Sequence, residues 1–265
     1  MSLHISSRQN PKVKEAISLY KHHEREKQGR FIIEGYRELS RAVQSQHPIS
    51  LVFTCPDLYL GSHENELLSK IQAPIYTCTT SVFEALSYRD RPDGLLALAP
   101  IQRHGLEILS HVNPCYVVAE AIEKPGNLGT ILRSADGAGA DGVIVCDPCT
   151  DLFNPNVVRA SVGTLFTQPV VQTTSEHLDP WLKARGIKII ATTPSADTLY
   201  TDVDLTQPVA ILMGTEQYGL SEKWMKSADI HVKIPMKGVA DSLNVAMATT
   251  LLLYEMVRQR QLRPH

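Results

Sequence analysis

The stretch CYVVAEAIEKPGNLGTILRSADGAGADGVIVC, residues 115–146, decides the fold of this chain. It begins with the apolar run CYVVAEA and ends with the apolar run GVIVC, and the residues from about Asn127 onward read as a helix between them. Strands that are continuous apolar runs and alternate with helices are typical of a parallel sheet covered on both faces. The stretch therefore predicts an α/β fold.

The same alternation continues to the end of the chain and also precedes the stretch. Downstream strands are expected at residues 168–172, 187–193, 208–214 and 230–235, and a long apolar helix follows Val239. Upstream, a basic helix is followed by strands expected at residues 31–35, 50–54, 75–78 and 94–100, with helices between them. We expect a small α/β domain at residues 1–100, a linker at 101–114 and a parallel-sheet domain at 115–265.

Composition excludes several classes of protein. With 265 residues and 43% hydrophobic content, the chain is long and apolar enough for a globular protein. No apolar run approaches the roughly 18 residues of a membrane span, so we expect a cytoplasmic protein without a membrane partner. Five cysteines, an odd number, suit a reducing compartment. Cys146 and Cys149 lack the second pair that a zinc ribbon needs, so no metal is expected.

Positive charge gathers near the N-terminus. The net charge is −2, yet residues 1–45 hold nine Lys or Arg against five Glu. Such a basic segment indicates either nucleic-acid binding through phosphate contacts or a solvated amphipathic helix. The candidate RNA-binding residues are Arg8, Lys12, Lys14, Arg25 and Arg37.

Four unusual loops follow the predicted strands of residues 115–265. Ligands of parallel sheets bind at the carboxyl ends of the strands, so these loops are the candidate site. They are EKPGN (123–127), TTPS (192–195), GTEQYG (214–219) and IPMKGVADSLN (234–244). The third loop lacks the Gly-Lys-Ser/Thr of a P-loop.

The start of the final helix is polar where its remainder is apolar. Asp241 or Ser242 can cap the helix, which leaves Asn244 without a role as a cap. Exposed amides at a helix N-terminus also bind ligand oxygens. The sequence therefore allows both a cap and a ligand site here.

These loops resemble the three signature motifs of the SpoU/TrmH family, RNA ribose 2′-O-methyltransferases of the SPOUT superfamily. The motifs match at KPGNLGTILRSADGAGADGVIV (124–145), ILMGTEQYGLS (211–221) and IPMKGVADSLNVAMATTLLLYE (234–255). The segments SRQNPKVKEAISLY (7–20), GRFIIEGYRELSRAV (29–43) and RPDGLLALAP (91–100) resemble the ribosomal-protein-like substrate-binding domain of family members that act on large-subunit ribosomal RNA.

The resemblance implies a deep trefoil knot that forms a pocket for S-adenosyl-L-methionine, which periodicity does not predict. It implies cofactor contacts from Thr193, Gly214, Glu216, Ile234, Met236, Leu243, Asn244 and Ala246.

It also implies that Asn127, Arg133, Glu216, Ser242 and Asn244 lie at the reacting ribose. Arg133 is the family's proposed proton acceptor, although a guanidinium is normally only a donor, and orientation of the ribose and phosphate is the alternative role. The family pairs as a homodimer in which this arginine reaches the partner's pocket. Glu123 and Lys124 depart from the family pattern, in which an Asp often precedes the Pro.

The expected function is methyl transfer from S-adenosylmethionine to a ribose 2′-hydroxyl, with ribosomal RNA as the substrate. Transfer RNA is an alternative substrate, and a non-catalytic RNA-binding protein with the same fold is an alternative function. A Rossmann-type enzyme is a third possibility, but Gly126 and Gly129 do not have the G-x-G-x-x-G spacing.

Overall fold

The computed structural model describes residues 3–109 and 112–261, and the chain divides into two compact units. Unit 1 comprises residues 1–102 and 151–167, and unit 2 comprises residues 103–150 and 168–265. The sequence pattern placed residues 151–167 in the parallel-sheet domain expected at residues 115–265. They belong to unit 1 because their aromatic side chains pack there: the ring centroids of Phe31 and Phe153 are 4.8 Å apart.

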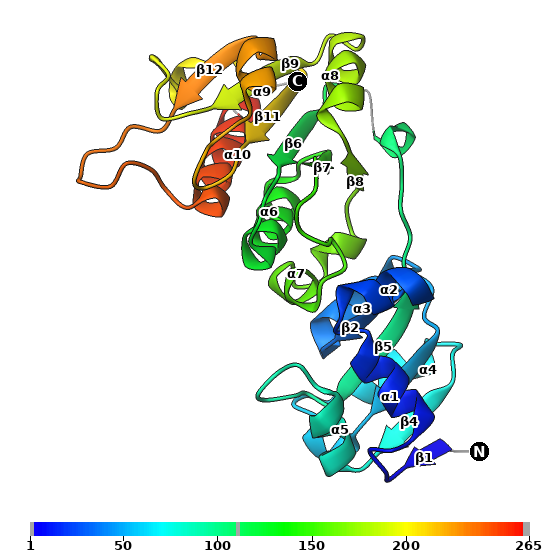
Figure 1. The fold of residues 1–265 in the computed structure, drawn as a ribbon. Helices are drawn as coiled ribbons and strands as arrows, with labels where there is room; N and C mark the ends of the chain where they lie inside the picture. Colours follow the sequence, from blue (N-terminus) through cyan, green and yellow to red (C-terminus); the bar gives the residue numbers. More distant parts are fainter. Residues whose placement is uncertain (1–2, 110–111, 262–265) are drawn as a thin grey trace. The chain divides into compact units, whose positions relative to one another are not determined.

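Unit 1 contains a five-stranded sheet in the order β1-β4-β3-β5-β2. Its strands β1, β2, β4 and β5 are labelled in Figure 1. Its strands β1, β4 and β3 are parallel, and β5 runs antiparallel to β3 and β2. The strands are β1 (Leu3–Ile5), β2 (Arg30–Glu34), β3 (Leu51–Thr54), β4 (Ile75–Cys78) and β5 (Leu95–Pro100). The helices are α1 (Pro11–Ser18), α2 (His22–Gln28), α3 (Tyr36–Gln44), α4 (Glu64–Ser69), α5 (Thr80–Leu86) and α7 (Pro155–Ala160), with short 3-10 turns at Pro56–Leu58 and Thr164–Phe166.

The N-terminal part of unit 1 differs from the sequence-based prediction. The expected basic helix is two helices, α1 and α2, and strand β1 precedes them. Helix α1 begins after Asn10, whose side chain accepts a hydrogen bond from the amide of Lys12 at 2.9 Å. Short edge strands such as β1 carry too little pattern to be found from sequence.

Arg25 is buried in unit 1, which corrects its prediction as an RNA-binding residue. The side chain is 1% exposed, and its Nε lies 2.7 Å from Oδ2 of Asp151. Its Nη1 donates to the carbonyls of Leu19 and Tyr20. A guanidinium with these partners cannot contact a phosphate, so Arg25 stabilises unit 1 instead.

Unit 2 contains a seven-stranded sheet in the order β10-β12-β9-β11-β6-β7-β8, and all its strand pairs are parallel. The strands are β6 (Cys115–Glu120), β7 (Gly142–Cys146), β8 (Val170–Thr173), β9 (Lys188–Thr192), β10 (Thr198–Leu199), β11 (Val209–Met213) and β12 (Ile230–Lys233). The helices are α6 (Pro125–Ala138), α8 (Ser175–Lys183), α9 (Glu222–Ser227) and α10 (Val245–Gln261), with 3-10 turns at Leu106–Ile108 and Tyr200–Asp202. The predicted parallel α/β fold is confirmed.

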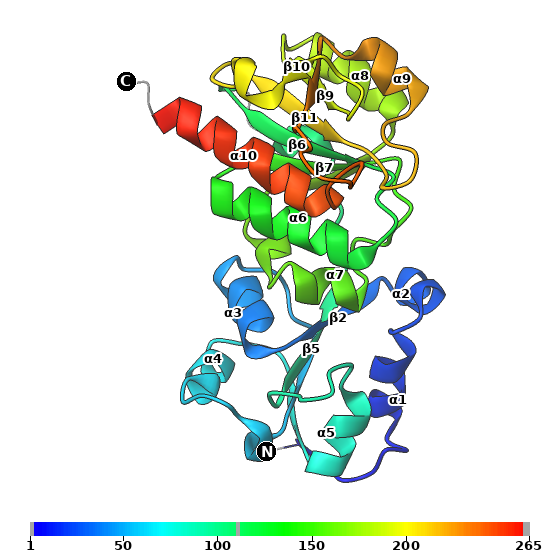
Figure 2. The same ribbon diagram turned by 90° about the vertical axis from the view of Figure 1, so that its left-hand side faces the viewer.

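Helices cover both faces of the unit 2 sheet. Helices α6 and α10 lie side by side on one face (Figure 2), joined by a hydrogen bond between the hydroxyls of Ser134 and Thr250 at 2.7 Å. On the other face α8 and α9 cover the sheet, and the buried Trp224 of α9 packs with Leu178 and Leu182 of α8. Within residues 3–109 and 112–261, no helix is long and apolar enough to cross a membrane.

The first prediction concerns the buried pair of Arg25 and Asp151. Arg25→Ala leaves the Asp151 carboxylate, 9% exposed, without its cation, and removal of one partner of a buried pair costs about 3–5 kcal/mol. Hydrogen exchange of the β2 and β5 amides should therefore accelerate. Lys14→Ala, an exposed site on α1, is the control and should change stability by less than about 0.5 kcal/mol. Equal protection in the two variants would show that the pair contributes nothing.

Candidate functional site

A cavity of unit 2 lies where the loops after β9, β11 and β12 meet the start of α10. Its volume is about 490 Å³, and Thr192, Met213 and the residues Gly214–Gly219 form one part of its lining. Of the predicted cofactor-binding residues, six line it: Thr193, Gly214, Glu216, Ile234, Met236 and Leu243. Ser242 lines it as well, whereas Asn244 and Ala246 do not.

The loop after β11 folds back on itself at the edge of this cavity. Thr215 and Gly219 exchange backbone hydrogen bonds of 2.9 and 3.1 Å. A Cβ added to Gly214 would lie 2.2 Å from the carbonyl carbon of Gly219. Because no real side-chain atom approaches a backbone atom so closely, the loop requires glycine at this position.

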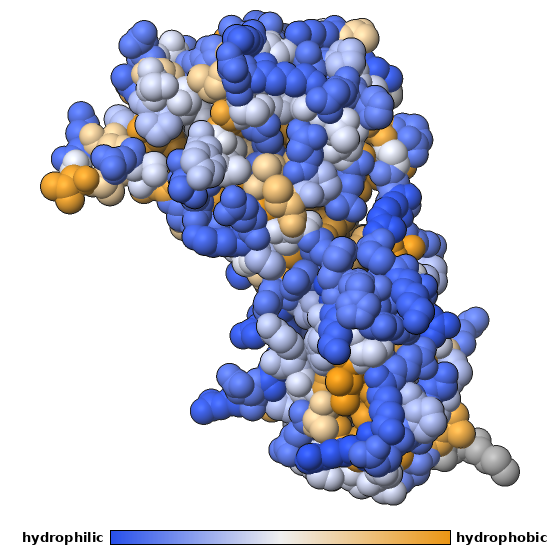
Figure 3. Space-filling model, viewed as in Figure 1, coloured by the Kyte–Doolittle hydropathy of each residue, from blue (hydrophilic) through white to orange (hydrophobic). Residues whose placement is uncertain are grey.

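The loop after β12 carries the other wall of the cavity. It runs from Ile234 to Asn244 between β12 and α10, and Ile234, Met236 and Leu243 line the cavity from it. Farther out, Val239 is fully exposed, and Figure 3 shows hydrophobic atoms at the tip of this loop. The apolar lining that Ile234, Met236 and Leu243 provide suits the flat, weakly polar part of a ligand.

A polar cluster formed by Lys124, Asn127, Glu216 and Asn244 adjoins the cavity. We call it the Glu216 cluster. The Oε1 of Glu216 accepts hydrogen bonds from Nδ2 of Asn127 at 2.7 Å and from Nδ2 of Asn244 at 2.9 Å. Its Oε2 pairs with the ammonium of Lys124. The cluster thus joins residues from three of the four loops that the sequence singled out.

These contacts change the acidity of Glu216. The hydrogen bond from Lys124, followed by the one from Asn127, lowers the pKa of the Glu216 carboxyl below its usual range. The Glu216 carboxylate therefore stays charged as the pH falls to the ordinary pKa of a glutamate. The hydrogen bonds of the cluster are lost only when the pH falls below that value. A lowered pKa also makes Glu216 a poor acceptor of a substrate proton.

Asn244 caps the final helix and also belongs to the Glu216 cluster. Its Oδ1 accepts the amide of Ala246 at 3.0 Å, so Asn244 caps α10, which begins at Val245. Neither Asp241 nor Ser242, the predicted caps, precedes the helix directly. The Nδ2 of Asn244 is then directed to Glu216 and to Oδ1 of Asn127, at 3.1 Å.

Asn127 lies within the first turn of its helix. Helix α6 begins at Pro125, which leaves Asn127 in the first turn with its side chain available to Glu216. Arg133 lies two turns farther along α6, is exposed, and does not line the unit 2 cavity. The described residues of the chain provide Arg133 with no hydrogen-bond or ion-pair partner.

Three residues at the site were missed or given little weight by sequence reasoning. Lys124 pairs with Glu216. The hydroxyl of Thr192 is buried without a hydrogen-bond partner in the cavity lining. Buried Glu120 accepts the amide of Ser221 at 2.8 Å and so fixes the end of the loop after β11. An acidic residue that ends an apolar strand was the available signal for Glu120.

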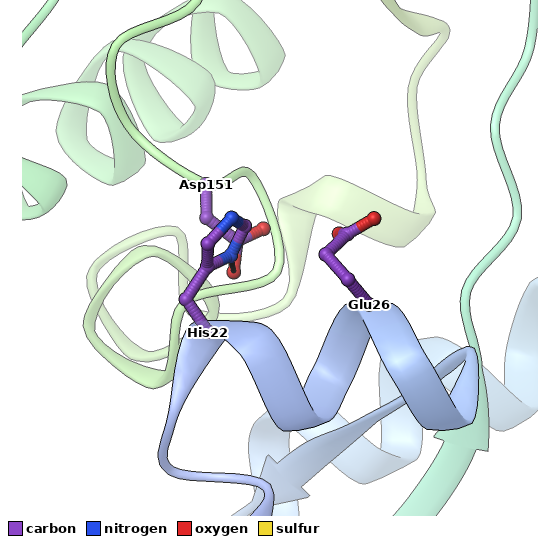
Figure 4. A group of neighbouring side chains, drawn as sticks. All are labelled: His22, Glu26 and Asp151. Atoms are coloured by element: carbon purple, nitrogen blue, oxygen red, sulfur yellow. Dashed lines mark hydrogen bonds and ion pairs between the residues drawn. The ribbon is translucent and has the colours of Figure 1, made fainter.

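His22, Glu26 and Asp151 of unit 1 form the group of side chains that most resembles a metal site (Figure 4). Their ligand atoms lie within 4.8 Å of one another. However, the Oδ2 of Asp151 that faces His22 is also 2.6 Å from Nη2 of Arg25. A guanidinium this close repels a metal cation from the same oxygen, so we assign no metal here.

Two family models match the chain. The SpoU rRNA Methylase family matches residues 114–254, and the MRM3-like substrate binding domain matches residues 10–97. The chain belongs to the SpoU rRNA methylase family. The resemblance seen in the sequence motifs is therefore confirmed.

Curated and solved relatives agree with this family. A 23S rRNA (uridine(2479)-2'-O)-methyltransferase of Streptomyces viridochromogenes is 34% identical over 245 residues, which cover 89% of this chain and 85% of that protein. A crystal structure of an RNA 2'-O ribose methyltransferase superposes with a TM-score of 0.88 and 39% identity, over 98% of this chain and 100% of the other. The structure of the SpoU methyltransferase AviRb of S. viridochromogenes, in complex with the cofactor AdoMet, superposes with a TM-score of 0.87 and 31% identity. The match covers 95% of this chain and 99% of that chain.

The second prediction tests the loop after β11. Gly214→Ala should open this loop, because the added Cβ meets the backbone of Gly219 and Leu220. Hydrogen exchange of the Thr215 and Gly219 amides should then accelerate while the β6 amides keep their protection. Gly137→Ala is the control, since its Cβ would meet nothing closer than 3.7 Å. Unchanged exchange at Thr215 and Gly219 would mean that the loop tolerates a side chain at position 214.

Proposed function

We propose that this chain transfers a methyl group from S-adenosylmethionine to a ribose 2′-hydroxyl of ribosomal RNA. One observation carries the proposal: in a SpoU family chain, the loops of the second and third motifs line one cavity, and the Glu216 cluster joins the first motif to them. One relative is a 23S rRNA 2'-O-methyltransferase, and the structure of another contains bound AdoMet.

The cavity of unit 2 fits S-adenosylmethionine in size and chemistry. Its volume of about 490 Å³ lies in the range of small-molecule sites. Ile234, Met236 and Leu243 offer apolar contacts to an adenine ring. The unpartnered hydroxyl of Thr192 and the backbone of Thr193 and Gly214 offer polar ones. Ala246 is buried in α10, and Asn244 faces the Glu216 cluster, so we assign these two residues to the support of the cavity.

The residues at the reacting ribose act mainly by positioning. When bound, S-adenosylmethionine supplies an electrophilic methyl group, and alignment of the nucleophile with that group can supply much of the rate enhancement. The Glu216 anion holds the amides of Asn127 and Asn244 in fixed directions. Ser242, on the cavity wall, can contact the ribose from the cofactor side.

Arg133 orients the substrate in this proposal. Its guanidinium is exposed and carries five donors, which suit a phosphate and a ribose oxygen. A guanidinium stays protonated at neutral pH, so it binds the developing charge rather than accepting the proton of the 2′-hydroxyl. The proton can leave to water.

Unit 1 binds the RNA in this proposal. It contains the match to the MRM3-like substrate binding domain. Lys14 and Arg37 are exposed and make no hydrogen bond or ion pair within the described chain, so both can contact phosphates. Arg8 donates to the carbonyl of Ser81, and Lys12 pairs with Glu15 at 3.2 Å, so these two cations are partly engaged.

The remaining expectations extend the same proposal. The loops after β9, β11 and β12 meet at one cavity, which supports a trefoil knot in this part of the chain. All five cysteines are free and four are buried, which supports work in the reducing cytoplasm.

We also propose that the enzyme is a homodimer that pairs through α10. The helix exposes Met247, Leu251 and Tyr254, which are 53%, 40% and 52% exposed and recur at helical spacing. A two-fold pair presents the same apolar strip on both chains and can bury it twice. Arg133 lies on the adjacent helix α6 and does not line the unit 2 cavity of its own chain. In the homodimer it can contact the cavity of the partner chain instead.

The third prediction tests the function and Asn244 together. Cells lacking the gene should lose one ribose methylation in ribosomal RNA, and the wild-type gene should restore it. Asn244→Ser keeps a good cap for α10 but removes the amide donor to Glu216, so purified enzyme should turn over about a hundredfold more slowly. Asn154→Ser makes the same change at the cap of α7, and this purified enzyme should turn over like wild type.

Two results would contradict this third prediction. If no ribose mark is lost with the gene, the proposed function is wrong. If Asn244→Ser turns over like wild type, Asn244 acts only as a cap.

The fourth prediction tests the shared site. Arg133→Ala and Gly214→Trp are each expected to be inactive, the latter because the side chain enters the loop at the cavity. If Arg133 serves the partner's cavity, mixed dimers hold one intact site, and mixing the variants restores up to about a quarter of wild-type activity. Activity that stays absent despite proven chain exchange would place Arg133 in its own chain's site. A single monomer mass in light scattering would overturn the dimer.

A further inference from the structure

Unit 1 has a cavity of its own that the proposed methyl transfer does not use. Its volume is about 510 Å³. The lining residues that carry the argument are Tyr36, Arg37, Glu64, Arg89, Asp93 and Arg159. All of them belong to residues 1–102 and 151–167. We call this the unit 1 cavity.

Three of its lining residues each carry one buried polar atom that has no hydrogen-bond partner: Oε2 of Glu64, Nε of Arg89 and Oδ1 of Asp93. Glu64 is 3% exposed and Asp93 is 9% exposed. Buried polar atoms are nearly always hydrogen-bonded, and one left alone costs free energy. Three such atoms in one cavity therefore point to a ligand that pairs with them.

The other ends of these three side chains are held firmly. Oε1 of Glu64 accepts the amide of Gly61 at 2.7 Å, and Oδ2 of Asp93 accepts the amide of Tyr36 at 2.8 Å. Nη2 of Arg89 donates to Oε1 of Glu38 at 2.7 Å. The three unpartnered atoms consequently have fixed positions, as a preorganised site requires.

Gly35 shows how tightly the arginine is placed. Its φ of 108° is in the left-handed region, and an added Cβ would lie 2.5 Å from Nη2 of Arg89. Only glycine allows Arg89 to approach the backbone here and reach both Glu38 and the carbonyl of Glu34.

The three atoms amount to one donor and two acceptors. A guanine base presents the complement on its Watson–Crick edge: the O6 acceptor and the N1–H and N2–H donors. Adenine, cytosine and uracil each offer at most one donor group on that edge, so one carboxylate would remain unpaired. The chemistry of the lining therefore selects guanine.

The exposed part of the lining suits the rest of a nucleotide. Arg37 and Arg159 are exposed, and neither side chain makes a hydrogen bond or ion pair within the described chain. They can contact phosphates on either side of a nucleoside. Tyr36 is half-buried and offers a ring on which a base can stack. Three arginines balance Glu38, Glu64 and Asp93, so the lining is neutral, which favours a base over a free phosphate.

We propose that the unit 1 cavity binds an unpaired guanine nucleotide of the RNA substrate. The inference rests on the proposal that unit 1 binds RNA, and it adds which base is recognised there and by which atoms. Sequence-specific proteins commonly read RNA through such unstacked bases.

Titration of the full-length protein with guanosine 5′-monophosphate and adenosine 5′-monophosphate tests the proposal. Saturating S-adenosylmethionine is present throughout to keep nucleotides out of the unit 2 cavity. The guanine nucleotide should bind at least about tenfold more tightly, since adenine leaves a buried carboxylate unpaired. Equal affinity for the two nucleotides, or no binding of either, overturns the proposal.

Glu64→Gln provides the residue-level test. The substitution keeps an oxygen for the amide of Gly61 and replaces Oε2 by a donor, so the preference for guanine should fall about tenfold. Glu66→Gln, on the same helix with its side chain 61% exposed, is the matched control and should bind like wild type. Wild-type guanine preference in Glu64→Gln, with its fold verified by thermal unfolding, also overturns the proposal.

A separate measurement keeps this proposal distinct from RNA binding by unit 1. Lys14→Glu, outside the cavity lining, should weaken binding of ribosomal RNA and reduce its salt dependence without changing the guanine preference. If Lys14→Glu and Glu64→Gln both bind that RNA like wild type, RNA binding by unit 1 fails. If RNA binding weakens as expected and only the preference for guanine is absent, the proposed guanine site is wrong and RNA binding by unit 1 stands.

Discussion

The hydrogen bonds to the carboxylate of Glu216 are the interaction on which the proposed methyl-transfer site depends. Glu216 lies in the loop after β11 and holds Lys124 and Asn127 from the start of α6 and Asn244 from the start of α10. Loops that follow different strands have no regular backbone hydrogen bonds to align them. A single anion that accepts from the starts of both α6 and α10 supplies that alignment, and its lowered pKa keeps it charged down to the ordinary pKa of a glutamate.

The layout of unit 2 could be predicted because each of its central strands is a continuous apolar run. Strands such as β6 and β11 are buried along their whole length, and only a sheet covered on both faces buries them so. The cavity could be placed because parallel strands direct their following loops to one edge. The particular contacts could not be predicted, since the bond from Asn127 to Glu216 joins residues 89 positions apart.

The wrong predictions share a physical cause. The cap of α10 was expected at Asp241 or Ser242, yet Asn244 caps this helix and also contacts residues that are distant in sequence. Arg25 was counted as a surface cation because charge alone does not reveal burial, and its partner Asp151 is supplied by a segment inserted between two strands of the other unit. Residues 151–167 look like part of the parallel alternation, and only the packing of Phe153 and Phe166 on Phe31 shows where they belong.

The polar groups of the two cavities differ in how firmly they are held. The Glu216 side chain is 31% exposed and Lys124 is 67% exposed, so solvent screens their attraction and the pair can exchange partners at little cost. Glu64 and Asp93 are buried, Arg89 is 20% exposed, and each of the three side chains is tied to a backbone group, which limits how far its unpartnered atom can move. An exposed cluster suits a site where substrate groups must replace existing contacts during each turnover. A buried, rigid set of unpaired atoms suits recognition, because selectivity between bases comes from the cost of leaving such atoms unpaired.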